Sequence, residues 1–329
     1  MGLALATYLV ADFGAAAILE AMLVIGWGLV AVSLFHLVPM LLSNLSWREL
    51  LPPDSRPGAG VLLWIRWIRE SINSLLPVGQ VGGDLVCIQL IYQRGVPAGS
   101  AIASMVVDLT IGVFTQMMFV TLGLVLLVTR SSDPAVLAVV WAVLAGLGIL
   151  LVAVVIFLLL QHAGIFGLMI RIGGNLIKSE WVARAGGMAA EIDRATRALY
   201  RDKKAFWSAM ACRLADWIAG AGEVWLLMYF LGKPVSVAEA LILESLATGV
   251  RSAAFLVPGA IGILEASFVV FGALFGISPA DSLALALGRR VRELALGIPG
   301  LVAWQLAEGR RLLGRGAKAP RERASSSPD

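Results

Sequence analysis

The chain has 329 residues, of which 59% are hydrophobic and only 15% are charged. Its mean hydropathy is +0.87. A soluble domain of this length needs far more charge to cover its surface, so the composition excludes a soluble enzyme and predicts an all-α, polytopic transmembrane helix bundle. The formal net charge is +4, but in a membrane protein the position of the basic residues matters more than their sum.

Residues 1–22 begin with an apolar stretch that is too short to cross a bilayer. Asp12 and Glu20 place charges directly after this stretch, and a signal peptide's basic flank and cleavage site are missing. This segment is either a partial first helix or an interfacial lead-in. The first full span is predicted at residues 23–42, since a crossing takes roughly 20 apolar residues.

The next segments are two short helices rather than one long one. The first is predicted over residues 61–76 and the second over 85–92, with Pro77, Gly82 and Gly83 between them. A proline and glycine break between two short apolar helices is typical of a re-entrant hairpin, which enters the membrane and leaves on the same side.

Four further segments are long enough to cross, and a second broken pair precedes the last of them. Crossings are predicted at 98–128, 134–160, 206–231 and 280–306. The second pair lies at 237–256 and 261–275, around Pro258 and Gly259. We expect residues 1–309 to form the integral membrane domain and residues 310–329, which are basic and then rich in serine and proline, to form a disordered tail.

Basic residues cluster in two places, which fixes the predicted orientation. The segment 161–204 and the C-terminal tail carry most of the lysine and arginine outside the spans. The positive-inside rule places both in the cytoplasm, so the C-terminus is cytoplasmic. Both segments lie on one side only if the hairpin at 237–275 does not cross. Topology thus explains the basic loop, and nothing in the sequence indicates nucleic-acid binding.

The two broken pairs match at an offset of 181 residues. The residue pairs that this offset superimposes are Pro77 and Pro258, Asp84 and Glu265, Gly95 and Gly276, Glu70 and Arg251, and Asp108 and Arg289. Three predicted crossings separate the two segments, and an odd number inverts one relative to the other. The sequence therefore predicts an inverted repeat with halves at about 59–130 and 236–307, as in many transporters.

Charged residues inside apolar helices are costly unless they are paired or hydrated. The acidic set is Glu70, Asp84, Asp108, Asp216, Glu223, Glu244, Glu265 and Glu293, and the basic set is Arg213, Arg251, Arg289, Arg290 and Arg292. Arg289 and Glu293 have the spacing of an intrahelical pair. The collection is either an ion-pair network that locks the bundle or the lining of a water-accessible cavity, which we favour because so many charges are costly to bury dry.

The glycine-rich segment 77–84 could present backbone N–H groups to a phosphate, or its glycines could simply allow a tight turn. His36 lies in an apolar span near Pro39 and could be a proton relay, but such a histidine is more often a satisfied core residue, and we assign it no functional role. Two histidines and two cysteines form no cluster in the sequence, so no metal site is predicted.

The motifs E-S-I-N-S-L-L-P at residues 70–77, G-G-D at 82–84 and V-V-D at 106–108 resemble the membrane region of lysylphosphatidylglycerol synthetase/flippase proteins. Residues 257–266 and 289–294 are most similar to the hopanoid-biosynthesis-associated branch. The resemblance extends from about residue 20 to 306. It implies a bacterial inner-membrane protein that moves lipid between leaflets, with a site formed by Glu70, Asn73, Gly82, Gly83, Asp84, Asp108, Arg251, Glu265 and Arg289; the charge pattern adds Arg213, Arg292 and Glu293.

The predicted function is therefore a flippase-like transporter of a hopanoid or a phospholipid. Lysyl transfer is not expected, because nothing that could fold as a transferase domain follows residue 310. A membrane enzyme that modifies lipid headgroups, or a scaffold for lipid-synthesis enzymes, is the alternative. No cofactor is expected, and no nucleotide-binding loop is present in the sequence. Transport could be passive or coupled to protons through Asp84, Asp108 or Glu265.

Overall fold

The computed structural model describes residues 23–76, 82–130, 134–164, 180–253 and 262–316. Over these residues the chain is helical and contains no strand, which confirms the predicted all-α class. The first half contains α3 (Gly28–Phe35), α4 (Leu37–Glu49), a 3-10 turn at Pro53–Ser55, α5 (Ala59–Leu75), α6 (Gly82–Tyr92) and α7 (Ala98–Val128). The second half contains α8 (Pro134–Ala163), α10 (Glu180–Arg201), α11 (Lys203–Phe230), α12 (Val237–Ala253), α13 (Ile263–Ala273) and α14 (Pro279–Gly316).

Among the described residues, three helical segments are long and apolar enough to cross a membrane. They are Gly28–Glu49, which comprises α3 and α4, the whole of α7, and Val143–Ala163 within α8. The predicted crossings at 206–231 and 280–306 also form helices, and α11 and α14 are 28 and 38 residues long. At 1.5 Å per residue both exceed the roughly 30 Å of a hydrocarbon core, but each carries several charges along its length.

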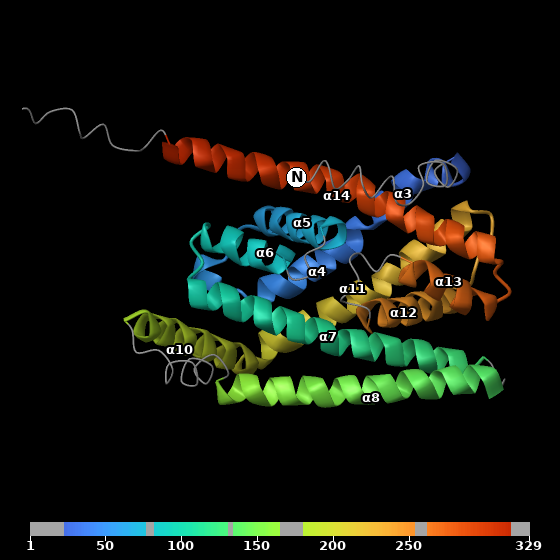
Figure 1. Ribbon diagram of the computed structural model, residues 1–329, viewed down its shortest axis with the longest axis horizontal. Coiled ribbons are helices and arrows are strands. Elements are labelled where there is room, and N and C mark those ends of the chain that lie inside the picture. The colour runs from blue at the N-terminus through green and yellow to red at the C-terminus, as the bar shows by residue number, and fades with distance from the viewer. Residues whose placement is uncertain (1–22, 77–81, 131–133, 165–179, 254–261, 317–329) are drawn as a thin grey trace, which may run out of the picture.

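The two short helix pairs occupy opposite halves of the bundle. In Figure 1, α5 and α6 lie in the left half and α12 and α13 in the right half, while α7, α8 and α14 run along the whole molecule. The end of the molecule that holds α10 also holds the C-terminal end of α14 (Figure 1). The loop at Gly232 lies at the other end, between α11 and α12.

Each pair has its own hydrophobic core. Ile65 of α5 and Cys87 of α6 are buried in a cluster that also includes Trp47 of α4. Leu246 of α12 and Phe268 of α13 belong to a larger cluster shared with α3, α7, α11 and α14. Each short pair therefore buries its apolar side chains in a separate core. Polar side chains near the ends of α5 and α12 lie between the two cores.

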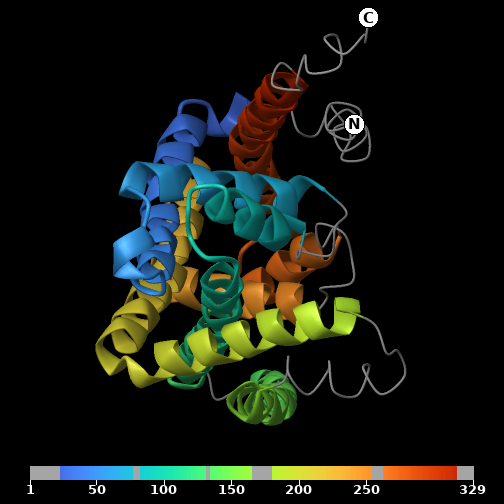
Figure 2. The ribbon, with the colours of Figure 1, turned by 90° about the vertical axis from the view of Figure 1, so that its left-hand side faces the viewer.

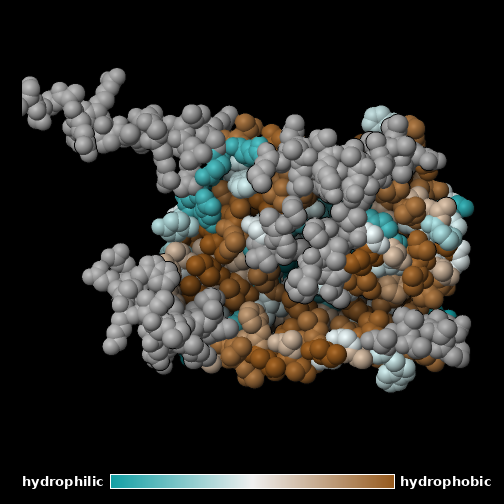
Figure 3. Space-filling model, in the orientation of Figure 1, coloured by the Kyte–Doolittle hydropathy of each residue, from teal (hydrophilic) through white to brown (hydrophobic). Residues whose placement is uncertain are grey.

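The helix α8 is the most peripheral element. Figure 2 shows it end-on, outside the remaining helices and below α10. Only 6% of its most apolar window is buried inside the protein, and Figure 3 shows hydrophobic side chains gathered over it. An apolar helix with so little protein contact is suited to a lipid environment.

The helix pattern recurs at the offset seen in the sequence. The helices α5 and α12 are both 17 residues long, and α6 and α13 are both 11 residues long. Adding 181 to the first residues of α6 and α7 gives 263 and 279, which begin α13 and α14. Gly95 and Gly276, which share the same offset, both have a positive φ, at 95° and 68°.

Several sequence-based predictions concern residues outside the described ranges or at the end of α14. The segment 1–22, most of the predicted phosphate-binding turn (77–81), the second break at 254–261 and the end of the tail at 317–329 lie outside the described residues. The helix α14 continues to Gly316, so residues 310–316 are helical and not part of the disordered tail that we predicted.

Candidate functional site

One helix of each short pair, α5 and α12, contributes to the lining of one pocket. Its volume is about 190 Å³, and its lining includes Glu70 and Asn73 near the end of α5 and Arg251 near the end of α12. The remaining ionisable side chains of this central pocket are His36, Asp216, Glu223, Glu244, Arg289, Arg292 and Glu293. Helices far apart in the chain thus bring five carboxylates, three arginines and a histidine to one polar space.

Helical spacing explains how each element contributes. On α11, Asp216, Gly220 and Glu223 follow one another at intervals of four and three residues, so they lie on one helix face. Glu244 and Arg251 of α12 are seven residues apart and share a face for the same reason. The faces of α11 and α12 that carry these residues are therefore turned toward the pocket.

Most of the pocket's charges are held in ion pairs between helices. Arg289 Nη2 donates to Glu244 Oε1 at 3.0 Å, and Arg289 Nη1 contacts the other oxygen of the same carboxylate. Arg251 Nη1 lies 3.4 Å from Glu293 Oε1. The predicted intrahelical pair of Arg289 with Glu293 is wrong, because Glu244 on α12 offers Arg289 a two-oxygen contact and Glu293 is bound by other arginines.

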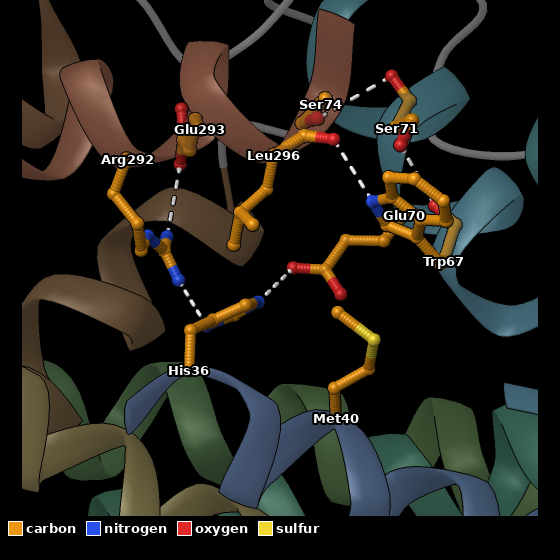
Figure 4. A pocket seen from close by; sticks show the side chains of 10 residues that line it. His36, Met40, Trp67, Glu70, Ser71, Ser74, Arg292, Glu293 and Leu296 are labelled. Carbon is orange, nitrogen blue, oxygen red and sulfur yellow. Dashed lines mark hydrogen bonds and ion pairs between the residues drawn. The ribbon is translucent and has the colours of Figure 1, made fainter. Parts of the chain in front are cut away.

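His36 lies at the break between α3 and α4 and contacts three charged side chains. Its Nε2 is 2.6 Å from Glu70 Oε1, and its Nδ1 is 2.6 Å from Glu223 Oε1. Arg292 Nη1 contacts the same Nδ1 (Figure 4). The same Nη1 lies 2.8 Å from Glu223 Oε2. A small cavity of about 10 Å³, with space for about one water, adjoins this group.

Two further charge clusters flank the pocket without lining it. On the side of α5, Asp108 Oδ2 accepts from Arg66 at 2.9 Å and lies 3.6 Å from Arg213 Nη2, and both arginines donate to Ser43 Oγ. Arg69 is paired with Asp84 in the same half. On the side of α13, Arg290 bridges Glu265 at 3.1 Å and Glu293 at 2.9 Å.

Half of the predicted site residues reach the pocket. Glu70, Asn73, Arg251, Arg289, Arg292 and Glu293 line it, whereas Gly82, Gly83, Asp84, Asp108, Arg213 and Glu265 do not. Asp84, Asp108, Arg213 and Glu265 belong to the flanking clusters. Gly83 N–H donates to Asn73 Oδ1 at 2.8 Å, so this donor is used within the protein rather than offered to a phosphate.

The sequence analysis missed His36, Arg66 and Arg69 as members of these clusters. His36 was interpreted as a core residue, yet it contacts two carboxylates in the centre of the bundle. A titratable residue within an apolar span is by itself a signal of a functional site. Arg66 and Arg69 flank tryptophans in the first short helix, where an interfacial position was the simpler interpretation.

The pocket retains capacity for a polar ligand. Arg289 Nε and Arg292 Nε are buried and have no hydrogen-bond partner within the protein. Buried donors of this kind are costly unless water or a ligand binds them. Within the described ranges, no group of three or more histidine, cysteine or carboxylate side chains is placed to hold a metal ion.

Comparison with known proteins gives one match. The family model described as "Lysylphosphatidylglycerol synthase TM region" matches residues 1–300. No curated protein and no solved structure matches the chain.

Proposed function

The chain belongs to the family of the lysylphosphatidylglycerol synthase transmembrane region, and on that premise we propose that it is a flippase-like lipid transporter. The observation that best supports this proposal is the central pocket, a polar space of about 190 Å³ in a bundle of apolar helices. A lipid headgroup moving between leaflets must cross the hydrocarbon layer, and a charged pocket at this depth lowers the cost of that passage.

The arrangement of the short helices supports an alternating mechanism. We infer that α5–α6 and α12–α13 are re-entrant hairpins of an inverted repeat, since the helix lengths of the two pairs match and the starts of α6 and α13 and the glycines that follow these helices are 181 residues apart. They occupy opposite halves of the bundle (Figure 1), and Glu70 and Arg251, which share that offset, both line the pocket. Movement of one half against the other could expose the pocket to each leaflet in turn.

We further propose that the cargo is a hopanoid or a phospholipid and that the protein resides in a bacterial inner membrane. The cargo and location follow from the motifs at 257–266 and 289–294 and from the two basic segments. The helix α10 and the C-terminal end of α14 lie at one end of the molecule, which fits a cytoplasmic position for both (Figure 1). Enzymes of lipid synthesis would be its partners.

Transport is favoured over catalysis by how the pocket carboxylates are held. Four of the five pocket carboxylates are held by cationic or histidine side chains: Glu244 and Glu293 lie against arginines, and Glu70 and Glu223 contact His36. A general base must be able to accept a substrate proton, and a carboxylate held by a cation is a poor acceptor. We therefore favour transport and keep lipid-headgroup modification, or a scaffold role, as the alternative.

The test measures the leaflet distribution of fluorescent phospholipids and of a hopanoid in proteoliposomes. The variant is Arg251→Gln, whose side chain is 25% exposed in the pocket, and the matched control is Lys233→Gln, in a surface ion pair at one end of the bundle. We expect translocation by the wild type, a loss of tenfold or more in Arg251→Gln and no change in Lys233→Gln. Equal behaviour of empty liposomes, wild type and both variants would contradict transport and favour the scaffold.

A further inference from the structure

The contacts of His36 change with its protonation, and this singles it out among the charged groups of the site. Its two ring nitrogens each lie 2.6 Å from a carboxylate oxygen, one on Glu70 and one on Glu223. A carboxylate only accepts, so both contacts are hydrogen bonds together only if both nitrogens carry a proton, as in the imidazolium. The same Nδ1 also contacts Arg292 Nη1, which only donates, so that contact requires a bare nitrogen.

These contacts define two alternative states. With the proton bound, Nδ1–H donates to Glu223 and Nε2–H donates to Glu70. After release of that proton, Nδ1 accepts from Arg292 and Nε2–H still donates to Glu70. The group of four then changes from neutral, with two cations against two carboxylates, to a net charge of minus one.

From this geometry we propose that His36 is a proton-binding site and that lipid movement through the central pocket exchanges a proton there. The inference rests on the proposed transport function and adds its energy source. Glu70 provides the link, because its side chain is 41% exposed and lines the pocket, whereas Glu223 is 2% exposed. Deprotonation of His36 removes the positive charge that attracts the Glu70 carboxylate, and the weakened contact lets this carboxylate bind the polar group of a lipid.

The charges around His36 allow both states. Facing it are Glu70 from α5, Glu223 and Asp216 from α11, Arg292, Arg289 and Glu293 from α14, and Glu244 and Arg251 from α12. Two arginines of this set are already committed, since Arg289 is paired with Glu244 and Arg251 with Glu293. Arg292 alone contacts the ring, and it keeps its 2.8 Å pair with Glu223 in either state.

The carboxylates suggested by the sequence as proton carriers are less suited. Asp84 is paired with Arg69, Asp108 with Arg66 and Glu265 with Arg290. An arginine remains charged at any physiological pH, so each of these carboxylates already has a permanent cationic partner. None of these three carboxylates lines the central pocket, whereas His36 does.

The first experiment imposes a pH gradient on proteoliposomes and measures the steady-state leaflet ratio of a translocated lipid. One proton exchanged per lipid shifts this ratio by up to about tenfold per pH unit. We expect the shift in the wild type and in His162→Gln, which removes the only other histidine of the chain, and its loss in His36→Gln. A wild type that moves lipid with a ratio independent of the gradient would overturn the coupling and leave transport intact. A wild type that moves no lipid would overturn both.

The second experiment reads the proton directly and does not depend on transport. In ¹⁵N-histidine-labelled His162→Gln protein, the single imidazole signal reports the charge of His36. We expect a change between charged and neutral ring within roughly pH 5 to 9, shifted by Glu70→Gln. A ring that holds one charge state throughout this range, or a gradient-driven shift that persists in His36→Gln, would overturn the assignment.

Discussion

At the scale of single residues, the fold depends on charges that are buried only because each has a partner. Asp108 is fully buried, and its carboxylate serves both Arg66 and Arg213. Removal of one member of a buried pair leaves the other charge without compensation, which costs far more than the pair itself contributes. Surface pairs such as Lys233 with Asp281 contribute about 1 kcal/mol or less, because water screens them.

Substitution of Asp108 tests this difference. Asp108→Ala removes the carboxylate that Arg66 and Arg213 share and leaves Arg213 only its 3.5 Å contact with Asp216, and we expect it to reduce the free energy of unfolding by about 3–5 kcal/mol. Lys233→Ala, the matched surface change, should reduce it by about 1 kcal/mol or less. Denaturant unfolding of both variants in the same detergent measures the difference. Equal losses in the two variants would contradict a structural role for the buried cluster.

At the scale of elements, the first helix pair depends on a close approach of α5 and α6. A Cβ atom at Gly83 would lie 2.4 Å from the backbone carbonyl oxygen of Arg69 and 2.6 Å from Asn73 Oδ1. No side chain fits there unless the helices separate. The helix α5 packs on α14 in a similar way, since a Cβ at Gly300 would lie 2.0 Å from Ser71 Oγ.

Alanine substitution at two glycines of this pair separates packing from helix propensity. Gly83→Ala should destabilise the protein by about 1–3 kcal/mol, because the clash involves backbone. Gly60→Ala in the first turn of α5, where a Cβ meets nothing within 4 Å, should be neutral or stabilising by up to about 1 kcal/mol. The thermal midpoints of the two variants in nanodiscs provide the comparison. A Gly83→Ala variant as stable as the wild type would show that α6 can move away from α5 at little cost.

At the scale of the whole molecule, the two ends of the bundle differ in charge and in the helix pair that they carry. The turn at Pro53–Ser55 lies between α4 and α5, on the side of the first pair, whereas Lys233 precedes the second. An inverted repeat requires that these two loops lie on opposite sides of the membrane. From the positive-inside rule we expect the end with α10 to face the cytoplasm.

Cysteine labelling tests this arrangement. In a background with Cys87 and Cys212 replaced by serine, Lys233→Cys should react with a membrane-impermeant maleimide in intact spheroplasts. Asp54→Cys should react only after the membrane is opened. Both positions are exposed, so access and not burial decides the outcome. Labelling of both positions from the same side would exclude the inverted arrangement of the two hairpins.

The sequence by itself determined the class of protein, the helical segments and the charged faces of α11 and α12. Hydropathy and helical periodicity are properties of neighbouring residues, so they can be read without a structure. The proline and glycines between residues 77 and 83 and the offset of 181 were visible for the same reason, although Gly82 and Gly83 begin α6 and do not lie between the two helices as predicted.

Only the tertiary structure decided which charges meet. Arg289 pairs with Glu244, 45 residues away, rather than with Glu293 on its own helix. His36 and Arg292 are 256 residues apart in sequence yet in contact. Such partners depend on how distant helices pack, and no local pattern contains that information. For the same reason, the sequence could not distinguish the predicted residues that line the pocket from those, such as Asp84 and Glu265, that form ion pairs beside it.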